Sequence, residues 1–202
     1  MIDVRAKFLQ FHEFSNEAYV VDYTNHPTGE HTALELLPEA PTVMIEHDGK
    51  QEPMPYFALV KHHTSRECRF YGINFEENRS LFQGHKQCEC MFTPETGHKP
   101  WVLLLEMKYG KPGNEPQNAD EAFQQLVATL QYLESTGRIN RHEQKIYLNI
   151  SMPWSNAEPF TSFRETLNDI AEALMRDKVM LLGYNKLLIH TESVIKAARV
   201  EV

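Results

Sequence analysis

The chain opens with apolar residues that recur at helical spacing. Four of them lie three or four positions apart within the first 24 residues, a pattern that predicts a helix with one apolar face. They are Phe8, Phe11, Phe14 and Ala18. The next stretch, residues 26–55, is richer in Pro, Gly, Glu and His, so we expect mostly loops there, with short strands such as Thr42–Glu46.

From residue 56 onward the pattern becomes one of alternating strands and helices. Strands are predicted where β-branched and aromatic residues lie between clusters of turn-forming residues. The run Trp101–Leu105 is apolar throughout, as in a strand that is buried on both faces. The expected strands are Cys68–Phe75, Gln87–Phe92, Trp101–Tyr109, Lys145–Met152 and Lys186–His190.

Two amphipathic helices separate the later strands. The first is expected at Ala119–Glu134, after a segment rich in Gly and Pro, with Asn118 as its N-cap and Gly137 just beyond its end. The second begins with a possible capping box of Ser162 and Glu165. Its apolar stripe consists of Phe163, Leu167, Ile170 and Leu174.

This order of elements predicts an α/β fold with a mixed central sheet flanked by helices. The length of 202 residues fits a single domain. We expect residues 56–202 to form its core and residues 1–55 to pack onto that core as an N-terminal elaboration.

Composition narrows the class of protein. With 42% apolar and 24% charged residues, the chain is close to the globular average, which argues against disorder and coiled coil. No apolar run approaches the roughly 20 residues that a membrane-spanning helix needs. The first residues are charged where a secretory signal is apolar, and three cysteines are too few for a disulfide framework. We therefore expect a cytoplasmic protein.

The candidate chemistry lies at the end of the apolar strand. Side chains alternate along a strand, so Glu106 and Lys108 point to the same face. On the preceding strand, Glu89 lies on the face opposite Cys88 and Cys90, and it can lie across from Glu106 if the two strands pair. Two carboxylates and an amine on one sheet face form a hard-cation site with a base or charge stabiliser beside it.

This arrangement resembles the PD-(D/E)xK nuclease superfamily over about residues 68–152. The shared features are an acid on a hairpin strand, an apolar strand ending in Glu-x-Lys, and a following helix. The resemblance implies a restriction-endonuclease-like core and a metal-dependent nuclease that hydrolyses phosphodiester bonds of DNA or RNA. Glu89 stands where the family usually has Asp, so a bound metal would lie farther from the strand.

The resemblance also implies a role for each site residue. Glu89 and Glu106 would hold Mg²⁺ or Mn²⁺, and Lys108 would orient or deprotonate the attacking water. A Gln of the following helix, Gln125 or Gln124, would join them. An additional acid from the N-terminal region would be Glu13 or Glu17.

Other functions remain open on the residues alone. A nuclease-like scaffold without catalysis can serve as a protein-interaction module, and it would expose a sizeable apolar patch. A Glu–Lys pair at a strand end is commonly a solvated pair worth less than about 1 kcal/mol. Zinc at Cys88 and Cys90, with His85 and His98, would need four ligands in tetrahedral geometry. Neither a nucleotide-binding glycine loop nor an elbow-type turn at a cysteine occurs in the sequence.

The charge distribution suggests where nucleic acid would approach. The net charge is −8, and residues 1–59 carry three basic and ten acidic side chains. Residues 60–111 carry eight basic and six acidic ones, so this segment alone is positive. So small a basic region favours recruitment by another protein or a homodimer. The candidate contacts within residues 61–111 are Lys61, Arg66, Arg69, Arg79, Lys86, Lys99 and Lys111.

Overall fold

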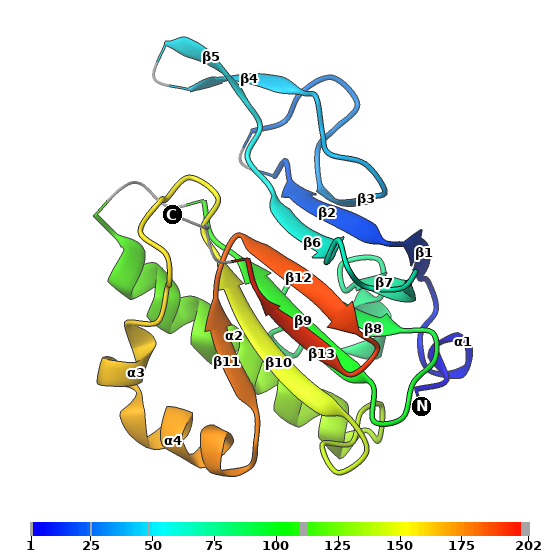
Figure 1. The fold of residues 1–202 in the computed structure, drawn as a ribbon. Helices are drawn as coiled ribbons and strands as arrows, with labels where there is room; N and C mark the ends of the chain where they lie inside the picture. Colours follow the sequence, from blue (N-terminus) through cyan, green and yellow to red (C-terminus); the bar gives the residue numbers. More distant parts are fainter. Residues whose placement is uncertain (1, 25, 48, 110–112, 199–202) are drawn as a thin grey trace.

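The computed structural model describes residues 2–24, 26–47, 49–109 and 113–198. It has three layers: a long helix, a six-stranded sheet and a five-stranded sheet. The helix α2 (Glu115–Ser135) lies behind the six-stranded sheet, and strands of the five-stranded sheet lie in front of it (Figure 1). The mixed sheets and flanking helices are those of an α/β fold, which confirms the predicted fold class. Within the described ranges, no helix combines the length and apolar character needed to cross a bilayer.

The six-stranded sheet is mixed and contains the strand that carries the candidate site. Its order is β1-β7-β8-β9-β10-β11. The pairs β9–β10 and β10–β11 are parallel, and the other pairs are antiparallel. The strands are β1 (His12–Ser15), β7 (Arg69–Asn74), β8 (Cys90–Pro94), β9 (Trp101–Met107), β10 (Lys145–Ser151) and β11 (Met180–Gly183).

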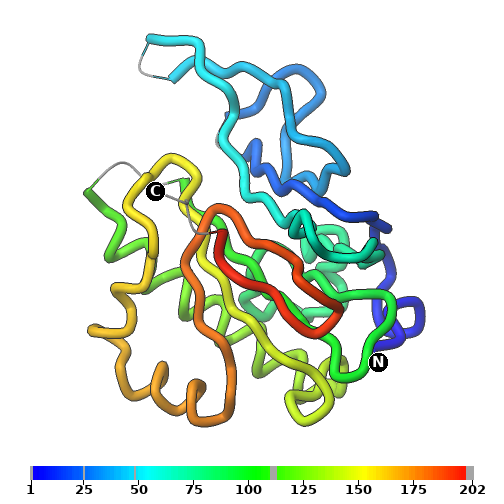
Figure 2. Tube along the Cα trace, viewed as in Figure 1, coloured from blue at the N-terminus to red at the C-terminus, as the bar shows by residue number. Residues whose placement is uncertain are grey.

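The five-stranded sheet joins strands from both ends of the sequence. Its order is β13-β12-β6-β2-β3, and β12 pairs in parallel with β6. A separate hairpin of β4 and β5 projects from the body at the top of Figure 2. These strands are β2 (Glu17–Asp22), β3 (Leu34–Leu37), β4 (Met44–His47), β5 (Lys50–Pro53), β6 (Phe57–Lys61), β12 (Lys186–Thr191) and β13 (Val194–Ala197).

Two apolar cores fill the spaces between the layers. The core between the two sheets contains Trp101, Leu103 and Leu105 of β9, packed against side chains of the five-stranded sheet. The core between the six-stranded sheet and the helices contains Val102 and Leu104 of the same strand. All five of these side chains are fully buried, as the apolar run in the sequence predicts for a strand with both faces covered.

The helix predicted from Phe8, Phe11, Phe14 and Ala18 is wrong. Only α1 (Val4–Lys7) is helical in this region, and β1 and β2 follow it. Phe8 packs into the core beneath the helices, whereas Phe14 packs between the two sheets. Tertiary packing therefore overrides the helical spacing, because these residues serve different cores.

The later helices also differ in detail from the prediction. The helix α2 begins with Asn114 as its N-cap, four residues before the predicted cap Asn118, and it tolerates a proline in its first turn. The predicted single helix after Ser162 is two helices, α3 (Phe163–Thr166) and α4 (Asn168–Arg176), which meet at Leu167. A short 3-10 helix, η1 (Arg79–Leu81), connects β7 and β8.

Gly183 of β11 allows a close backbone approach, which leads to a prediction of stability. A Cβ atom at this position would lie 2.5 Å from the carbonyl oxygen of Phe160. We expect Gly183→Ala to lower the free energy of unfolding by about 1–3 kcal/mol, because backbone must move to relieve the overlap. Thermal unfolding measures this loss, at roughly 2–4 °C per kcal/mol for a chain of this size.

Gly72→Ala is the matched control for this prediction. A Cβ atom at Gly72 would come within 2.7 Å of Phe14, but only side-chain atoms lie in its way. Side chains shift more easily than backbone, so the loss should be smaller at Gly72. A Gly183→Ala variant as stable as the parent protein would contradict the close contact.

Candidate active site

The two strands that carry the predicted acids are paired. β8 runs antiparallel to β9, with Cys90 opposite Leu105. β8 begins three residues later than the predicted strand Gln87–Phe92. The backbone N–H of Glu89 still donates to the carbonyl oxygen of Leu105 at 3.1 Å. Continued by one residue, this register sets Glu89 opposite Glu106.

Alternation along β9 decides which face the site occupies. Val102 and Leu104 pack toward the helices, and Glu106 shares their parity on the strand. The candidate acid thus faces α2, away from the five-stranded sheet. Its side chain is 1% exposed, so the carboxylate lies inside the protein at the end of an apolar strand.

A chain of polar contacts connects β9 to α2. The Nζ atom of Lys108 lies 2.8 Å from Oε1 of Glu106 and donates to Oε1 of Gln125 at 2.7 Å. Nε2 of Gln125 donates in turn to the backbone oxygen of Gln87 at 3.4 Å. The Lys108 side chain is 23% exposed, so the cluster reaches solvent on the lysine side.

The two carboxyl groups hold their protons more tightly than ordinary glutamic acids. Burial away from water is the main cause that raises the pKa of Glu89 to about 8, and the nearby Glu106 carboxylate adds to the shift. Burial likewise raises the pKa of Glu106, to about 7, against the opposing effect of the Lys108 ammonium. A pair of desolvated, mutually repelling carboxylates is stabilised by a nearby cation.

The donors at this position suit a small divalent cation. Among the described residues, the Oε2 atom of Glu106 is buried and has no hydrogen-bond partner, and Oε1 has only its ion pair with Lys108. The described residues hold no cluster of three His, Cys, Asp or Glu side chains suited to a metal. Mg²⁺ is commonly held by one or two carboxylates with waters and substrate phosphates completing its shell. The pair Glu89 and Glu106 meets that requirement.

The structure distinguishes between the alternative residues of the sequence analysis. Gln125 contacts Lys108, whereas Gln124 is exposed on the same helix. Glu13 forms an ion pair with Arg5 at 3.2 Å, with both side chains well exposed. Glu17 accepts a hydrogen bond from the hydroxyl of its neighbour Tyr19. Neither of these N-terminal acids contacts the cluster.

Two residues near the site were not predicted. Asp22, at the end of β2, contributes negative charge that raises the pKa of both Glu89 and Glu106. Thr129 of α2 is buried, and its hydroxyl accepts the backbone N–H of Cys88 at 2.7 Å and donates to the backbone oxygen of Gln125. Thr129 thus fixes the start of β8 against the helix. The signal available in the sequence was the position of this threonine next to the apolar stripe of the predicted helix Ala119–Glu134.

The two neighbouring cysteines do not share a face. Cys88 packs in the core beneath the helices, whereas Cys90 packs between the two sheets. The prediction that both point away from Glu89 is wrong for Cys88, because the ladder with β9 reaches only Glu89 and the backbone N–H of Cys88 donates to Thr129 of α2 instead. Burial raises the pKa of both thiols.

The predicted basic contacts are dispersed over the surface. Arg69 lies 3.6 Å from Glu95, and Arg79 lies 3.0 Å from Glu76, so both are paired with acids. Lys86 precedes Gln87 and is nearest in sequence to the cluster. The other four candidates lie elsewhere: Lys61 is the last residue of β6, Arg66 follows that strand, Lys99 precedes β9, and Lys111 is outside the described residues.

Fold and site together define an α/β protein with a buried carboxylate, a lysine and a glutamine at the end of a central strand. No family model matches the chain, and no curated protein matches it. Among solved structures, it is similar to SfsA of Pyrococcus furiosus, determined in complex with Ca²⁺, with 7% identity over 94% of this chain and 95% of that one. The TM-score is 0.24, too low to carry an argument about fold or function.

Proposed function

We propose that this protein is a metal-dependent nuclease with a restriction-endonuclease-like core, which hydrolyses phosphodiester bonds of DNA or RNA. One observation carries the proposal: the buried Glu106, with an oxygen that lacks a partner, lies in contact with Lys108, which in turn contacts Gln125. Glu89 completes the cluster from the neighbouring strand. Carboxylates that can hold a metal, with a lysine and an amide beside them, supply the charge stabilisation that metal-assisted phosphodiester hydrolysis uses.

Each residue of the cluster has a definite task in this reaction. Glu89 and Glu106 would hold Mg²⁺ or Mn²⁺, which when bound polarises the scissile phosphate and lowers the pKa of water. The Lys108 ammonium has three N–H donors, and its contacts with Glu106 and Gln125 occupy two of them. The third donor remains for the attacking water or for a phosphate oxygen that gains charge. Gln125 positions the ammonium for that contact.

The proposed partner is a nucleic acid that binds weakly. The chain carries a net charge of −8, and Arg69 and Arg79 are paired with acids. Few phosphates can be neutralised, so affinity should be low, should fall only gradually with salt, and should depend on a second protein or a second copy of this chain. Lys86, exposed and three residues before Glu89 in the sequence, is the basic residue most suited to contact the nucleic-acid strand near the scissile bond.

A cleavage assay with Lys108 and Gln125 variants tests the proposal. We expect Mg²⁺- or Mn²⁺-dependent cleavage of DNA or RNA, and Lys108→Ala should lower kcat by about 10²–10⁴-fold because the donor at the reacting atoms is lost. Gln125→Ala should lower kcat less, since it removes only the contact that positions Lys108. Steady-state rates with short single- and double-stranded substrates measure both effects.

Gln124→Ala is the matched control, because Gln124 is the exposed neighbour of Gln125 on the same helix. Its rate should equal that of the parent protein. Metal-dependent cleavage that is unchanged in Lys108→Ala would refute the assignment of the cluster as the active site.

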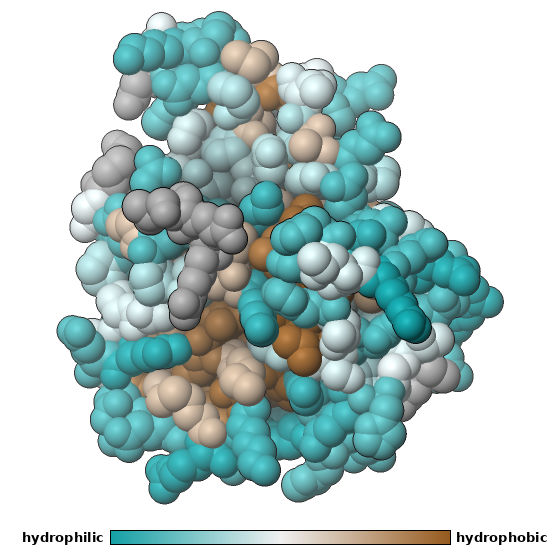
Figure 3. Space-filling view, viewed as in Figure 1, coloured by the Kyte–Doolittle hydropathy of each residue, from teal (hydrophilic) through white to brown (hydrophobic). Residues whose placement is uncertain are grey.

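The second candidate function is a catalytically inactive scaffold that binds another protein. It is favoured by the exposed apolar side chains Ile170, Met175 and Met180, which are 42–47% exposed. Hydrophobic residues gather over α4 and β11 at the lower left of Figure 3. This candidate predicts that Mn²⁺ does not bind at Glu89 and Glu106. Calorimetry with Mn²⁺ therefore separates the two candidates.

A further inference from the structure

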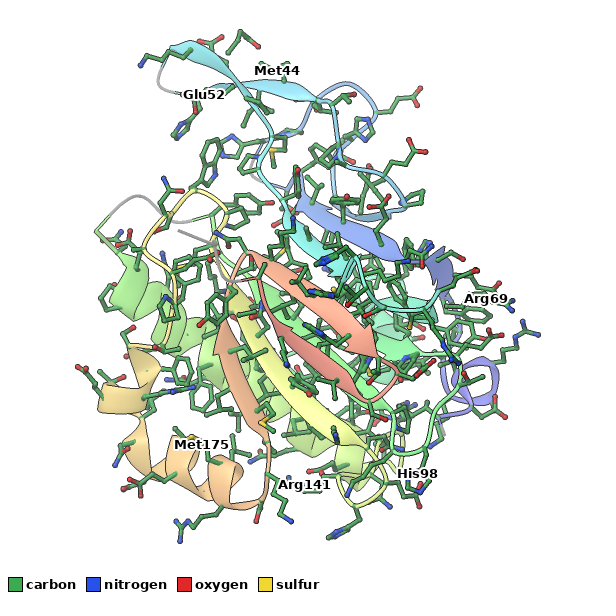
Figure 4. All side chains as sticks on the ribbon, in the orientation of Figure 1. Met44, Glu52, Arg69, His98, Arg141 and Met175 are labelled. Carbon is green, nitrogen blue, oxygen red and sulfur yellow. The ribbon has the colours of Figure 1, made fainter. Side chains whose placement is uncertain are left out.

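A second polar site lies at the opposite end of the sheet from Glu106. A cavity of about 1000 Å³ opens where β10 begins, beside the ends of α2 and α4. Arg141, which lines it, lies at the lower end of Figure 4, and Met44 and Glu52 of the hairpin lie at the upper end. Five residue steps along β9, at about 3.3 Å each, put roughly 16 Å between Trp101 at this end of the sheet and Glu106. The cavity is therefore separate from the candidate active site.

Unpaired positive charge surrounds the cavity. Among the described residues, no ion pair involves Lys99, Lys145, Arg176 or Lys178, and all four line it. One acid of the lining, Glu143, is likewise outside every ion pair of the described residues, so the unpaired charge around the cavity is still positive. Lys99 and Lys178 occupy turn positions with φ of 58° and 63°. In a chain of net charge −8, four such cations around one hollow favour an anion.

Two further cations form the framework of the cavity. Arg141 pairs with both Glu134 and Asp177, which connects the end of α2 to the end of α4. Lys7 donates to the backbone oxygens of Gly137 and Arg138 at 2.7 and 3.0 Å. These contacts hold the wall in place, so the four unpaired cations surround a preformed hollow.

A buried amide adds a neutral donor to this set. Gln144 lines the cavity and is only 4% exposed. Its Oε1 accepts the backbone N–H of Asn140 at 2.5 Å, which fixes the orientation of the amide. No described residue accepts a hydrogen bond from its Nε2, and this atom is not sealed from solvent. The amide N–H groups therefore have no acceptor among the described residues, and Gln144 is part of the cavity lining.

The apolar part of the lining sets the kind of anion. Ile139 and Ile146 are buried beneath the cavity, and Met180 is 47% exposed beside it. Hydrogen-bond donors around an apolar floor, formed by these three side chains, favour a ligand that has an anionic group and a flat or apolar part. The volume lies at the upper limit of the usual range for ligand pockets, about 300–1000 Å³, and so admits a molecule of nucleotide size.

We propose that this cavity binds a free nucleotide, with its phosphates against the cationic rim and Gln144 and its base over the apolar floor. The phosphates have only acceptor oxygens, which match the lysines, the arginine and the free amide donor. The proposal does not depend on nuclease activity, because no residue of the cavity belongs to the Glu106 cluster.

Calorimetric titration with ADP, inorganic pyrophosphate and adenosine, all without divalent metal, tests the proposal. We expect ADP to bind with a Kd below about 1 mM, pyrophosphate more weakly, and adenosine not at all. Absence of ADP binding at about 5 mM, or adenosine binding as tight as that of ADP, would overturn it. Displacement of ADP by a short 5′-phosphorylated oligonucleotide that binds more tightly would also overturn it, in favour of a nucleic-acid end.

Gln144→Glu is the most specific variant for this test. The new carboxylate retains an acceptor for the Asn140 N–H but replaces the free amide donor with a negative oxygen. ADP affinity should fall about tenfold or more while the melting temperature stays near that of the parent protein. Lys145→Gln with Lys178→Gln should have a similar effect, and the distant Lys86→Gln should have none. Unchanged affinity in both cavity variants would overturn the site.

Discussion

Glu106→Gln is expected to lower Mg²⁺-dependent cleavage of nucleic acid by about a thousandfold. The substitution keeps the shape of a side chain that is 1% exposed, but it removes one of the two negative groups that would hold the metal. The neutral amide is also a weaker partner for the Lys108 ammonium, which lies 2.8 Å from Oε1. The cleavage rate and the affinity for Mn²⁺, measured by calorimetric titration, should therefore both fall in this variant.

Glu95→Gln is the control for charge removal. Glu95 follows the other end of β8 and pairs with Arg69 at the surface, so cleavage and metal binding should be unaffected. If Glu106→Gln binds Mn²⁺ as the parent protein does, the ion is held elsewhere. If Glu106→Gln loses Mn²⁺ binding while cleavage persists, the cluster is a metal site without a role in the reaction.

The stability of the metal-free protein should fall as pH rises from about 4.5 to 8. Glu89 and Glu106 have folded-state pKa values of about 8 and 7, above the unfolded value of 4.5. The folded state therefore binds more protons than the unfolded state in this window, and folding stability decreases with rising pH. Thermal unfolding in the presence of a chelator should show the midpoint falling by several degrees between these limits, at roughly 2–4 °C per kcal/mol.

Bound metal should restore the folding stability that the metal-free protein loses, and the effect should be clearest above pH 8. An ion that binds only the folded state stabilises it by about 2.7 kcal/mol when its free concentration is a hundred times its Kd. The double variant Glu89→Gln, Glu106→Gln should show a flatter pH profile and no response to Mg²⁺. Glu165→Gln with Glu172→Gln, both exposed on the far helices, should retain the parent profile. A parent protein whose stability rises through this window would contradict the raised pKa values of the two carboxyl groups.

Much of the central fold could be predicted from the sequence because its strands are buried on both faces. The run Trp101–Leu105 of β9 is apolar at every position, so it could be recognised as a strand without knowledge of its partner strands. Strict alternation along that strand then put Glu106 and Lys108 on one face. The antiparallel pairing of β8 with β9 confirmed the predicted neighbours and brought Glu89 to the same edge.

The missed features depend on contacts between residues distant in sequence. The five-stranded sheet joins β6 to β12 across more than a hundred residues, and no local pattern specifies such a partner. The choice between Gln124 and Gln125 depends on the rotation of α2 about its axis, which is set by packing. The cavity with Gln144 is formed by turns and helix ends, where sequence periodicity gives no information.

The parallel pairing of β6 with β12 has a consequence for the order in which the protein folds during synthesis. Ribosomes release β6 long before β12, so the apolar side chains Phe57 and Leu59 lack part of their final cover until β12 has emerged. The strands β8, β9 and β10 and the helix α2 emerge earlier, and they are close together in sequence. Glu89 and Glu106 can thus come together on a nascent chain whose five-stranded sheet is still incomplete. A chaperone that binds β6 in that interval would not obstruct Glu106.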